Sequence, residues 1–391
     1  MIRKVTLGLV CICGTFISLE TSAQIGTGQL DGRVNTINTA VPFLRISPDA
    51  RSGAMGDVGV AISPDANAMY WNLSKLPFAP VKSAVSVTYT PWLKELVNDV
   101  FLANVSGYTQ LDELQAVSAS LRYFSLGNIE FTDITGGSLG NYRPREFAFD
   151  AGYARKLSDH FSVGVALRYI YSNLASGQNA NGQAIRAGKT IAGDVSAFYT
   201  KDFEKDDGTV NTLNLGLALT NLGGKVSYTQ SAQNKDFIPS NLGLGAAYTV
   251  GLDEYNKLTF ALDINKLLVP TPDSARKYQE KGVVEGIFSS FGDAPGGFKE
   301  ELQELMYSVG MEYWYNDQFA VRAGYFNENK NKGNRKYFTA GIGVKYDIFG
   351  LNFSYLVPSG SGIQRNPLSN TLRFTLTFDL VRRDEPSRSG F

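Results

Sequence analysis

The sequence predicts an all-β chain: a transmembrane antiparallel β-barrel of about 14 strands, with an N-terminal hatch, or plug, in its lumen. Over most of the chain, bulky apolar residues alternate with small or charged ones at a period of two. The connections between these segments alternate between longer and shorter, as in barrels that have long loops at one end and tight turns at the other. No segment after the leader supplies the roughly 20 consecutive apolar residues of a membrane-spanning helix.

The chain begins with two basic residues, continues through an apolar run at 5–19 and reaches the small-residue cleavage signature that Ala23 closes. Residues 1–23 are therefore predicted to be a secretory signal peptide. Both cysteines, Cys11 and Cys13, lie in this leader, so we expect no disulfide or thiol chemistry in the mature protein. A lipoprotein anchor is the weaker alternative, because neither cysteine follows a small residue.

The charge balance excludes one class of partner. Without the leader, the chain is within about one charge of neutral, and it carries no basic patch. We therefore expect no nucleic-acid partner.

Residues 24–80 are predicted to form the hatch segment. They contain glycines, the turn sequence SPDA twice and a short helix expected around Ala66 to Leu76, but no clear pair of barrel strands. Tyr70 and Trp71 have two interpretations: they anchor this segment to the barrel wall, or they contact a ligand. The residues that we select as the hatch motif are Asp65, Asn67, Tyr70, Trp71, Asn72 and Leu76.

Residues 81–380 are predicted to form the barrel. In FSVGVALRYIYSN, residues 161–173, the phenylalanine, valines, leucine and tyrosines share one face, and small residues with Arg168 share the other. Segments of this kind are centred near residues 87, 103, 120, 150, 167, 195, 217, 245, 261, 310, 322, 342, 354 and 375.

The polar face distinguishes a membrane barrel from a soluble sandwich. In a sandwich the bulky face fills the core, whereas charges on successive strands suit a polar lumen and are costly against lipid. A secreted all-β repeat protein with solvent-facing charges remains the alternative. The charges expected to line the lumen are Asp150, Arg168, Asp263, Arg322, Lys345 and Arg373.

The connection from Lys266 to Glu304 is the longest, and it is predicted to contain two short helices. Asp273 or Ser274 can cap the first. Phe298, Leu302 and Leu305 fall on one face of the second. The apolar residues of the first helix region either fold back into the barrel mouth or bind a partner. This candidate partner-binding loop comprises Val283, Val284, Ile287, Phe288 and Phe291.

The sequence predicts no catalytic residue, metal site or cofactor. The single histidine, His160, lies in a turn expected at the periplasmic end, away from any site on the outer leaflet. The run Asp202–Gly208 resembles part of a calcium-binding loop, but it lacks the glutamate that such a loop needs at its twelfth position. The chain is therefore expected not to be an enzyme.

The tail, residues 381–391, ends in Phe391, an aromatic terminus of the kind that barrel-assembly machinery often recognises.

The stretch SPDARSGAMGDVGVAISPDANAMYWNLSKL, Ser47 to Leu76, resembles the amino-terminal signature of the PorV (or LptO) family, FadL-related outer-membrane barrels of the type IX secretion system. One departure is Leu73, where the family usually has a proline. The resemblance covers the mature chain almost end to end, and it implies the outer membrane of a Gram-negative bacterium as location.

The resemblance also implies a role that is not enzymatic. Such a protein receives secreted cargo, through the cargo's C-terminal signal domain, from the translocation channel. It then delivers the cargo to a sortase-like surface attachment complex, which links it to lipopolysaccharide. The alternative is a FadL-like outer-membrane transporter for small hydrophobic molecules.

Overall fold

The computed structural model describes residues 35–93, 97–132, 135–177, 179–180, 183–229, 235–272, 277–359 and 371–382. Fourteen strands form a closed barrel in which each strand pairs antiparallel with its neighbours in the chain, and the last strand pairs with the first. The predicted barrel is confirmed, and each of the 14 predicted centres falls within one strand. The barrel strands are β1 (Val81–Pro91), β2 (Val100–Gln110), β3 (Gln115–Leu126), β6 (Arg145–Lys156), β7 (Phe161–Asn173), β10 (Gly188–Glu204), β11 (Val210–Gly223), β12 (Asn241–Gly251), β13 (Asn256–Leu267), β14 (Met306–Tyr315), β15 (Phe319–Asn327), β16 (Lys336–Tyr346), β17 (Phe349–Pro358) and β18 (Thr371–Arg382).

The alternation of residue types matches the alternation of burial along the strands. In β7, Val165 and Leu167 are exposed on the outer wall, Leu167 by 68%, whereas Ala166 and Arg168 are buried on the inner side. The exposed large apolar residues of the other strands continue this outer surface, which suits contact with hydrocarbon.

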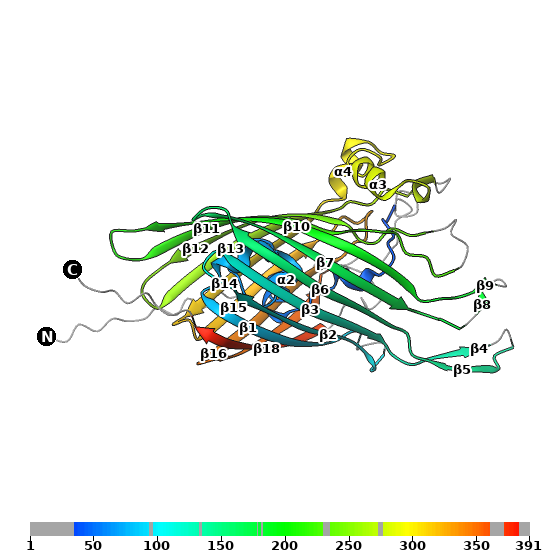
Figure 1. Ribbon diagram of the computed structural model, residues 1–391, viewed down its shortest axis with the longest axis horizontal. Helices are drawn as coiled ribbons and strands as arrows, with labels where there is room; N and C mark the ends of the chain where they lie inside the picture. Colours follow the sequence, from blue (N-terminus) through cyan, green and yellow to red (C-terminus); the bar gives the residue numbers. More distant parts are fainter. Residues whose placement is uncertain are drawn as a thin grey trace, which may run out of the picture.

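The two ends of the barrel differ as the loop lengths predict (Figure 1). The short connections, residues 111–114, 157–160, 205–209, 252–255, 316–318 and 347–348, all lie at one end, which we call the periplasmic end. The long connections lie at the other, the outer end. They include two small hairpins and three short helices: β4 (Ile129–Thr132) with β5 (Ser138–Tyr142), β8 (Asn179–Ala180) with β9 (Gln183–Ala184), η4 (Lys277–Gln279), α3 (Val283–Ser289) and α4 (Phe298–Gln303).

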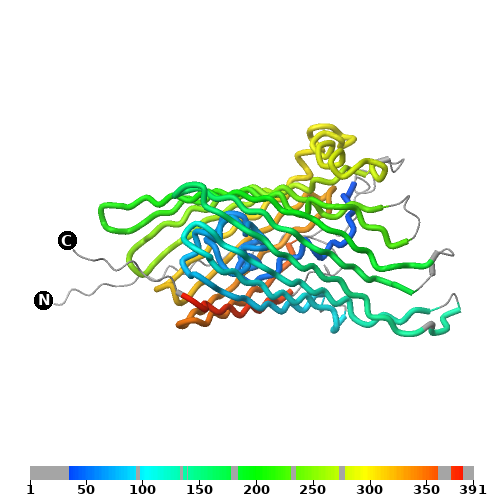
Figure 2. Tube along the Cα trace, in the orientation of Figure 1, coloured from blue at the N-terminus to red at the C-terminus, as the bar shows by residue number. Residues whose placement is uncertain are grey.

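The segment before β1 runs inside the ring of strands, where it is drawn in blue in Figure 2. We call described residues 35–80 the plug. Its elements are η2 (Pro42–Arg45), α1 (Ala50–Gly53), α2 (Ala68–Trp71) and η3 (Leu73–Phe78). The single helix expected at 66–76 is wrong in detail, because Asn72 adopts an extended conformation and divides it into two pieces. No helix among the described residues is long and apolar enough to cross a membrane.

Candidate functional site: the filled lumen and the outer loop

The plug passes through the barrel from the outer end to the periplasmic end. At the outer end, the backbone N–H of Asn35 donates to the carbonyl of Asn331 at 2.9 Å, and its side-chain amide donates to the carbonyl of Pro272. At the periplasmic end, the Gln110 side chain of β2 donates to the carbonyls of Leu76, Pro77 and Ala79 in the residues that lead into β1. The plug is thus tied to the wall at both ends.

Glycines on the inner wall let the plug backbone approach closely. A Cβ atom on Gly324 of β15 would lie 2.1 Å from the backbone N of Gly56, and one on Gly216 of β11 would lie 2.4 Å from the carbonyl oxygen of Val60. Gly56 itself has φ +71° and lies against the backbone of Tyr325, so a side chain there would be both strained and obstructed. The small residues of the inner face therefore make room for the plug.

The aromatic pair of the hatch motif lies inside this packing. The Tyr70 and Trp71 rings meet edge to face with centroids 4.7 Å apart. The Trp71 indole N–H donates to Asp49 Oδ2 at 2.7 Å, and the guanidinium of Arg122 on β3 lies 4.9 Å from the Tyr70 ring centroid. Trp71 is thus held within the plug and Tyr70 contacts the wall, while both also border a small cavity.

The other hatch-motif residues make polar or apolar contacts of their own. Asp65 accepts from Arg51, and Asn67 accepts from the Ser86 hydroxyl of β1 at 2.6 Å. Asn72 donates to the carbonyls of Val60, in the plug, and Ala197, in β10. Leu76 is fully buried in an apolar cluster between plug and wall.

Two of the predicted lumen charges, Asp150 and Arg168, belong to one network that crosses five neighbouring strands, β3, β6, β7, β10 and β11. Asp150 lies between Arg122 and Arg168 and accepts from Ser120, and Arg168 also pairs with Asp194 at 2.8 Å. All four charged side chains are buried. Each charge therefore has an opposite partner on an adjacent strand, the arrangement that buried ions need.

The remaining lumen charges contact the plug or another charged residue of the wall. Arg322 donates to Glu312, which also receives two hydrogen bonds from Arg51 of the plug at 2.8 and 2.9 Å. Asp263 accepts the backbone N–H groups of Gly59 and Val60. Two further pairs complete the set: Arg373 faces Asp57 at 3.9 Å, and Lys345 pairs with Asp379 near the periplasmic end.

Several residues of this lumen were missed by the sequence reasoning. Glu312 lies on the inward side of β14 at the same period as the other lumen charges, so the alternation alone could have identified it. The plug residues Arg51, Asp49 and Lys75 gave no such signal, because a plug has no regular period. The Lys75 ammonium is buried and donates to the carbonyl of Gly59 at 2.7 Å.

The outer half of the lumen is filled by apolar side chains of the chain itself. Phe43 and Leu44 of the plug pack with wall residues such as Phe124 and Ile170, and with Ile238 of the connection before β12. Two small cavities lie at the plug, of about 80 and 10 Å³, and a larger space of about 500 Å³ lies on its periplasmic side, below Asp65.

The candidate partner-binding loop projects from the outer end of the barrel (Figure 1). Val284, Phe288 and Phe291 are exposed, Phe288 by 74%, whereas Val283 and Ile287 are half-buried. The inner side of α3 instead packs through Gly286, where a Cβ would lie 2.7 Å from the Phe237 ring. These three residues therefore do not fold back into the barrel mouth, and whether they bind a partner stays a prediction.

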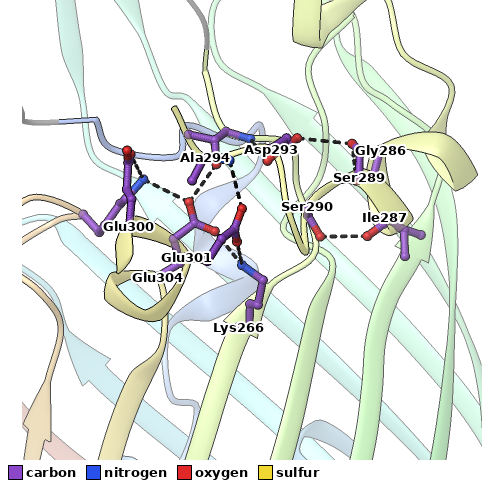
Figure 3. A network of polar contacts seen from close by, with 12 residues as sticks. Lys266, Gly286, Ile287, Ser289, Ser290, Asp293, Ala294, Glu300, Glu301 and Glu304 are labelled. Carbon is purple, nitrogen blue, oxygen red and sulfur yellow. Dashed lines mark hydrogen bonds and ion pairs between the residues drawn. The ribbon is translucent and has the colours of Figure 1, made fainter. Parts of the chain in front are cut away.

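The predicted second helix is present as α4, and the face that carries Phe298 and Leu302 turns outward. Phe298 and Leu302 of α4 are exposed, and Leu305 is half-buried, while Glu301 and Glu304 face inward. The reason is Lys266 of β13, whose ammonium pairs with Glu301 at 3.0 Å and Glu304 at 2.5 Å (Figure 3). A buried lysine needs carboxylate partners, and α4 supplies them at the expense of its apolar face.

Further contacts fix this loop to the barrel. Lys332, from the connection between β15 and β16, pairs with Glu300 and Glu304, and Thr271 donates to Glu304 at 2.7 Å. The predicted caps Asp273 and Ser274 lie outside the described residues, and α3 begins after Gly282 instead. The exposed apolar surface is thus carried by a loop with a firmly paired underside.

The residues weighed for chemistry lie apart from this lumen. His160 is exposed in the turn between β6 and β7, beside Tyr199. The run Asp202–Gly208 spans the end of β10 and the turn that follows, where Asp207 accepts the N–H of Thr209. Within the described part of the chain, no group of three or more histidine, cysteine, aspartate or glutamate side chains is arranged to hold a metal ion.

Comparison with known proteins gives one family. The profile of the family described as "Type IX secretion system protein PorV" matches residues 29–274, more than half of the chain. No curated protein matches the sequence significantly.

Matches to solved structures have low sequence identity and TM-scores below 0.5. The Pseudomonas putida toluene transporter TodX is 14% identical with a TM-score of 0.46, covering 84% of this chain and 95% of its own. The Ralstonia pickettii toluene transporter TbuX is 11% identical, with a TM-score of 0.45 and coverages of 86% and 98%. A Pseudomonas aeruginosa FadL homologue is 9% identical, with a TM-score of 0.41 and coverages of 88% and 99%.

Proposed function

The chain belongs to the PorV family of type IX secretion system proteins, and from this premise we propose that it carries secreted cargo between two machines of the outer membrane. The family is one of secretion components, not of enzymes. In this proposal, the barrel receives cargo from the translocation channel by binding the cargo's C-terminal signal domain. It then passes the cargo to the sortase-like surface attachment complex, while its apolar outer wall contacts outer-membrane lipid and lipopolysaccharide.

The observation that carries the proposal is the exposed apolar surface of the outer loop. Phe288 and Phe298 are among the most exposed large apolar side chains. They belong to α3 and α4, which lie outside the ring of barrel strands in Figure 1. Their exposure has no benefit in an isolated protein, because apolar surface in water is unfavourable. The ion pairs of Glu301 and Glu304 with Lys266 hold the opposite face of α4 against the barrel. The apolar face therefore points outward, where a protein partner can reach it.

The filled lumen favours a role in which the protein binds partners at its surface over transport through the barrel. A FadL-like transporter of small hydrophobic molecules, the alternative function, needs an apolar path through the barrel. Here the apolar outer half of the lumen is occupied by Phe43, Leu44 and their neighbours, and transport would require this packing to open.

The first test changes only the outer surface. The triple variant Val284→Ser, Phe288→Ser and Phe291→Ser should assemble as a barrel but lose co-purification with the translocation channel or with cargo. Deletion of 283–291 should have the same effect. Lys299→Ser, an exposed polar position of α4, is the matched control and should retain both partners. Unchanged recovery of channel and cargo by the triple variant would exclude this surface.

The second test separates the two functions. A strain that lacks the gene should lose surface-attached cargo and accumulate it in the periplasm. A defect confined to the uptake of a hydrophobic nutrient, with normal cargo attachment, would instead support the transporter.

A further inference from the structure

We propose that the cavity of about 80 Å³ beside the plug binds a small oxyanion, such as inorganic phosphate, between Arg45 and Arg335. Arg45 ends the plug helix η2, and Arg335 precedes β16 on the wall, so the site would join plug and barrel near the outer end. This inference does not depend on the proposed secretion role.

The two guanidinium groups converge on one atom. Arg45 Nη2 lies 3.1 Å from the sulfur of Met306, and Arg335 Nη2 lies 3.8 Å from the same sulfur. Two like charges this close repel each other, and a thioether is only a weak acceptor. An anion between them would remove the repulsion and accept hydrogen bonds from both.

Each of the two nearby carboxylates already faces an arginine other than Arg45. Glu328 receives two hydrogen bonds from Arg335, at 2.8 and 3.0 Å. Asp57, which also lines the cavity, accepts from the Tyr337 hydroxyl at 2.5 Å through Oδ2, while its Oδ1 makes no hydrogen bond within the described part of the chain and faces Arg373 at 3.9 Å. Three guanidinium groups therefore share two carboxylates, and among the described residues Arg45 has no carboxylate partner. One positive charge beside the cavity therefore has no carboxylate of its own, at a place where Arg45 and Arg335 are both half-buried.

A second donor points to the same ligand chemistry. The Ser47 hydroxyl, two residues after Arg45, lines the cavity, is 3% exposed and has no hydrogen-bond partner among the described residues. Guanidinium groups bind carboxylate and phosphate oxygens in a forked geometry, so an oxyanion suits this set of donors. The volume is enough for a few water molecules or one such ion.

The test uses the full-length protein purified in detergent, with inorganic phosphate as the probe at constant ionic strength. The unfolding midpoint should rise with phosphate concentration and then saturate, because a ligand that binds only the folded state stabilises it in this way. Arg45→Gln should abolish the rise, and Arg45→Lys, which keeps the charge but loses the fork, should weaken it. Arg155→Gln, at an exposed arginine of β6, is the control and should respond as the wild type does.

Crystals soaked in selenate provide an independent readout that does not depend on variant folding. An anomalous peak between the two guanidinium groups is expected. A wild type and an Arg45→Gln variant that respond equally to phosphate, or a cavity that contains only water after the soak, would overturn the assignment.

Discussion

A single added methyl group at Gly324 should displace the plug. An ideal Cβ on this residue lies 2.1 Å from the backbone N of Gly56 and from the backbone carbonyl carbon of Met55, whereas carbon atoms in favourable contact are about 3.5–4.0 Å apart. The overlap exceeds about 1 Å, and the obstructing atoms are backbone, which cannot rotate away as a side chain can. The Gly324→Ala variant must therefore move the plug or distort β15.

The magnitude follows from two opposing terms. Overpacking of this kind costs about 1–3 kcal/mol. Replacing a glycine by alanine also restricts the unfolded chain, which stabilises the fold by about 0.4–1 kcal/mol when the site tolerates the methyl group. Gly193→Ala on β10 is the matched control, since its Cβ would meet only the carbonyl oxygen of Ala166, at 3.6 Å. We expect the two variants to differ by about 2 kcal/mol in the free energy of unfolding.

Two measurements check this reasoning. Denaturant unfolding in detergent gives the free-energy difference between the variants, and conductance in planar bilayers reports whether the lumen has opened. Gly324→Ala should be less stable and more conductive than Gly193→Ala. Equal stability and equal conductance would refute the close seating of the plug against β15.

Three further substitutions test individual contacts of the lumen and of one turn. Asp150→Asn leaves its flanking arginines short of a buried counter-charge and should lower the free energy of unfolding by about 3–5 kcal/mol in a urea titration; a change below about 1 kcal/mol would show that water reaches the network. Trp71→Phe removes the indole N–H that donates to Asp49 and should lower stability by about 1–3 kcal/mol, whereas an unchanged melting curve would argue against that hydrogen bond. In the turn between β12 and β13, the backbone N–H of Tyr255 and the side-chain amide of Asn256 hold the pKa of the Asp253 carboxyl below its ordinary value. Because the folded pKa is depressed, the contribution of Asp253 to folding stability is fully present above the unfolded pKa and is lost as pH falls through the folded pKa. Asp253→Asn should therefore flatten the pH dependence of the unfolding midpoint below about pH 4. Identical acid profiles of the variant and the wild type would contradict this.

The inner and outer faces of the wall could be predicted without coordinates. A strand turns its side chains to alternate sides, so Leu167 and Arg168 had to face opposite ways wherever the strand lay. The alternation of long and short connections likewise follows from an up-and-down barrel, since successive connections must fall at opposite ends. These features are local properties of the chain, and all 14 strands were identified from them.

The contacts inside the lumen were decided only by the tertiary structure. Arg51 meets Glu312 across 261 positions of sequence, and no periodicity specifies which carboxylate a plug residue will reach. Only the folded barrel showed that the small inner residues receive the plug backbone as closely as at Gly324.

In the outer loop, too, one feature followed from the sequence and another only from the tertiary structure. The sequence by itself determined that α4 is amphipathic, with apolar residues such as Phe298 on one face and glutamates on the other. It could not determine which face turns inward, because the usual preference for burying apolar residues points the wrong way here. The tertiary structure decided it by placing Lys266 beneath Glu301 and Glu304: a buried ammonium without a counter-charge costs more free energy than leaving a few apolar side chains exposed.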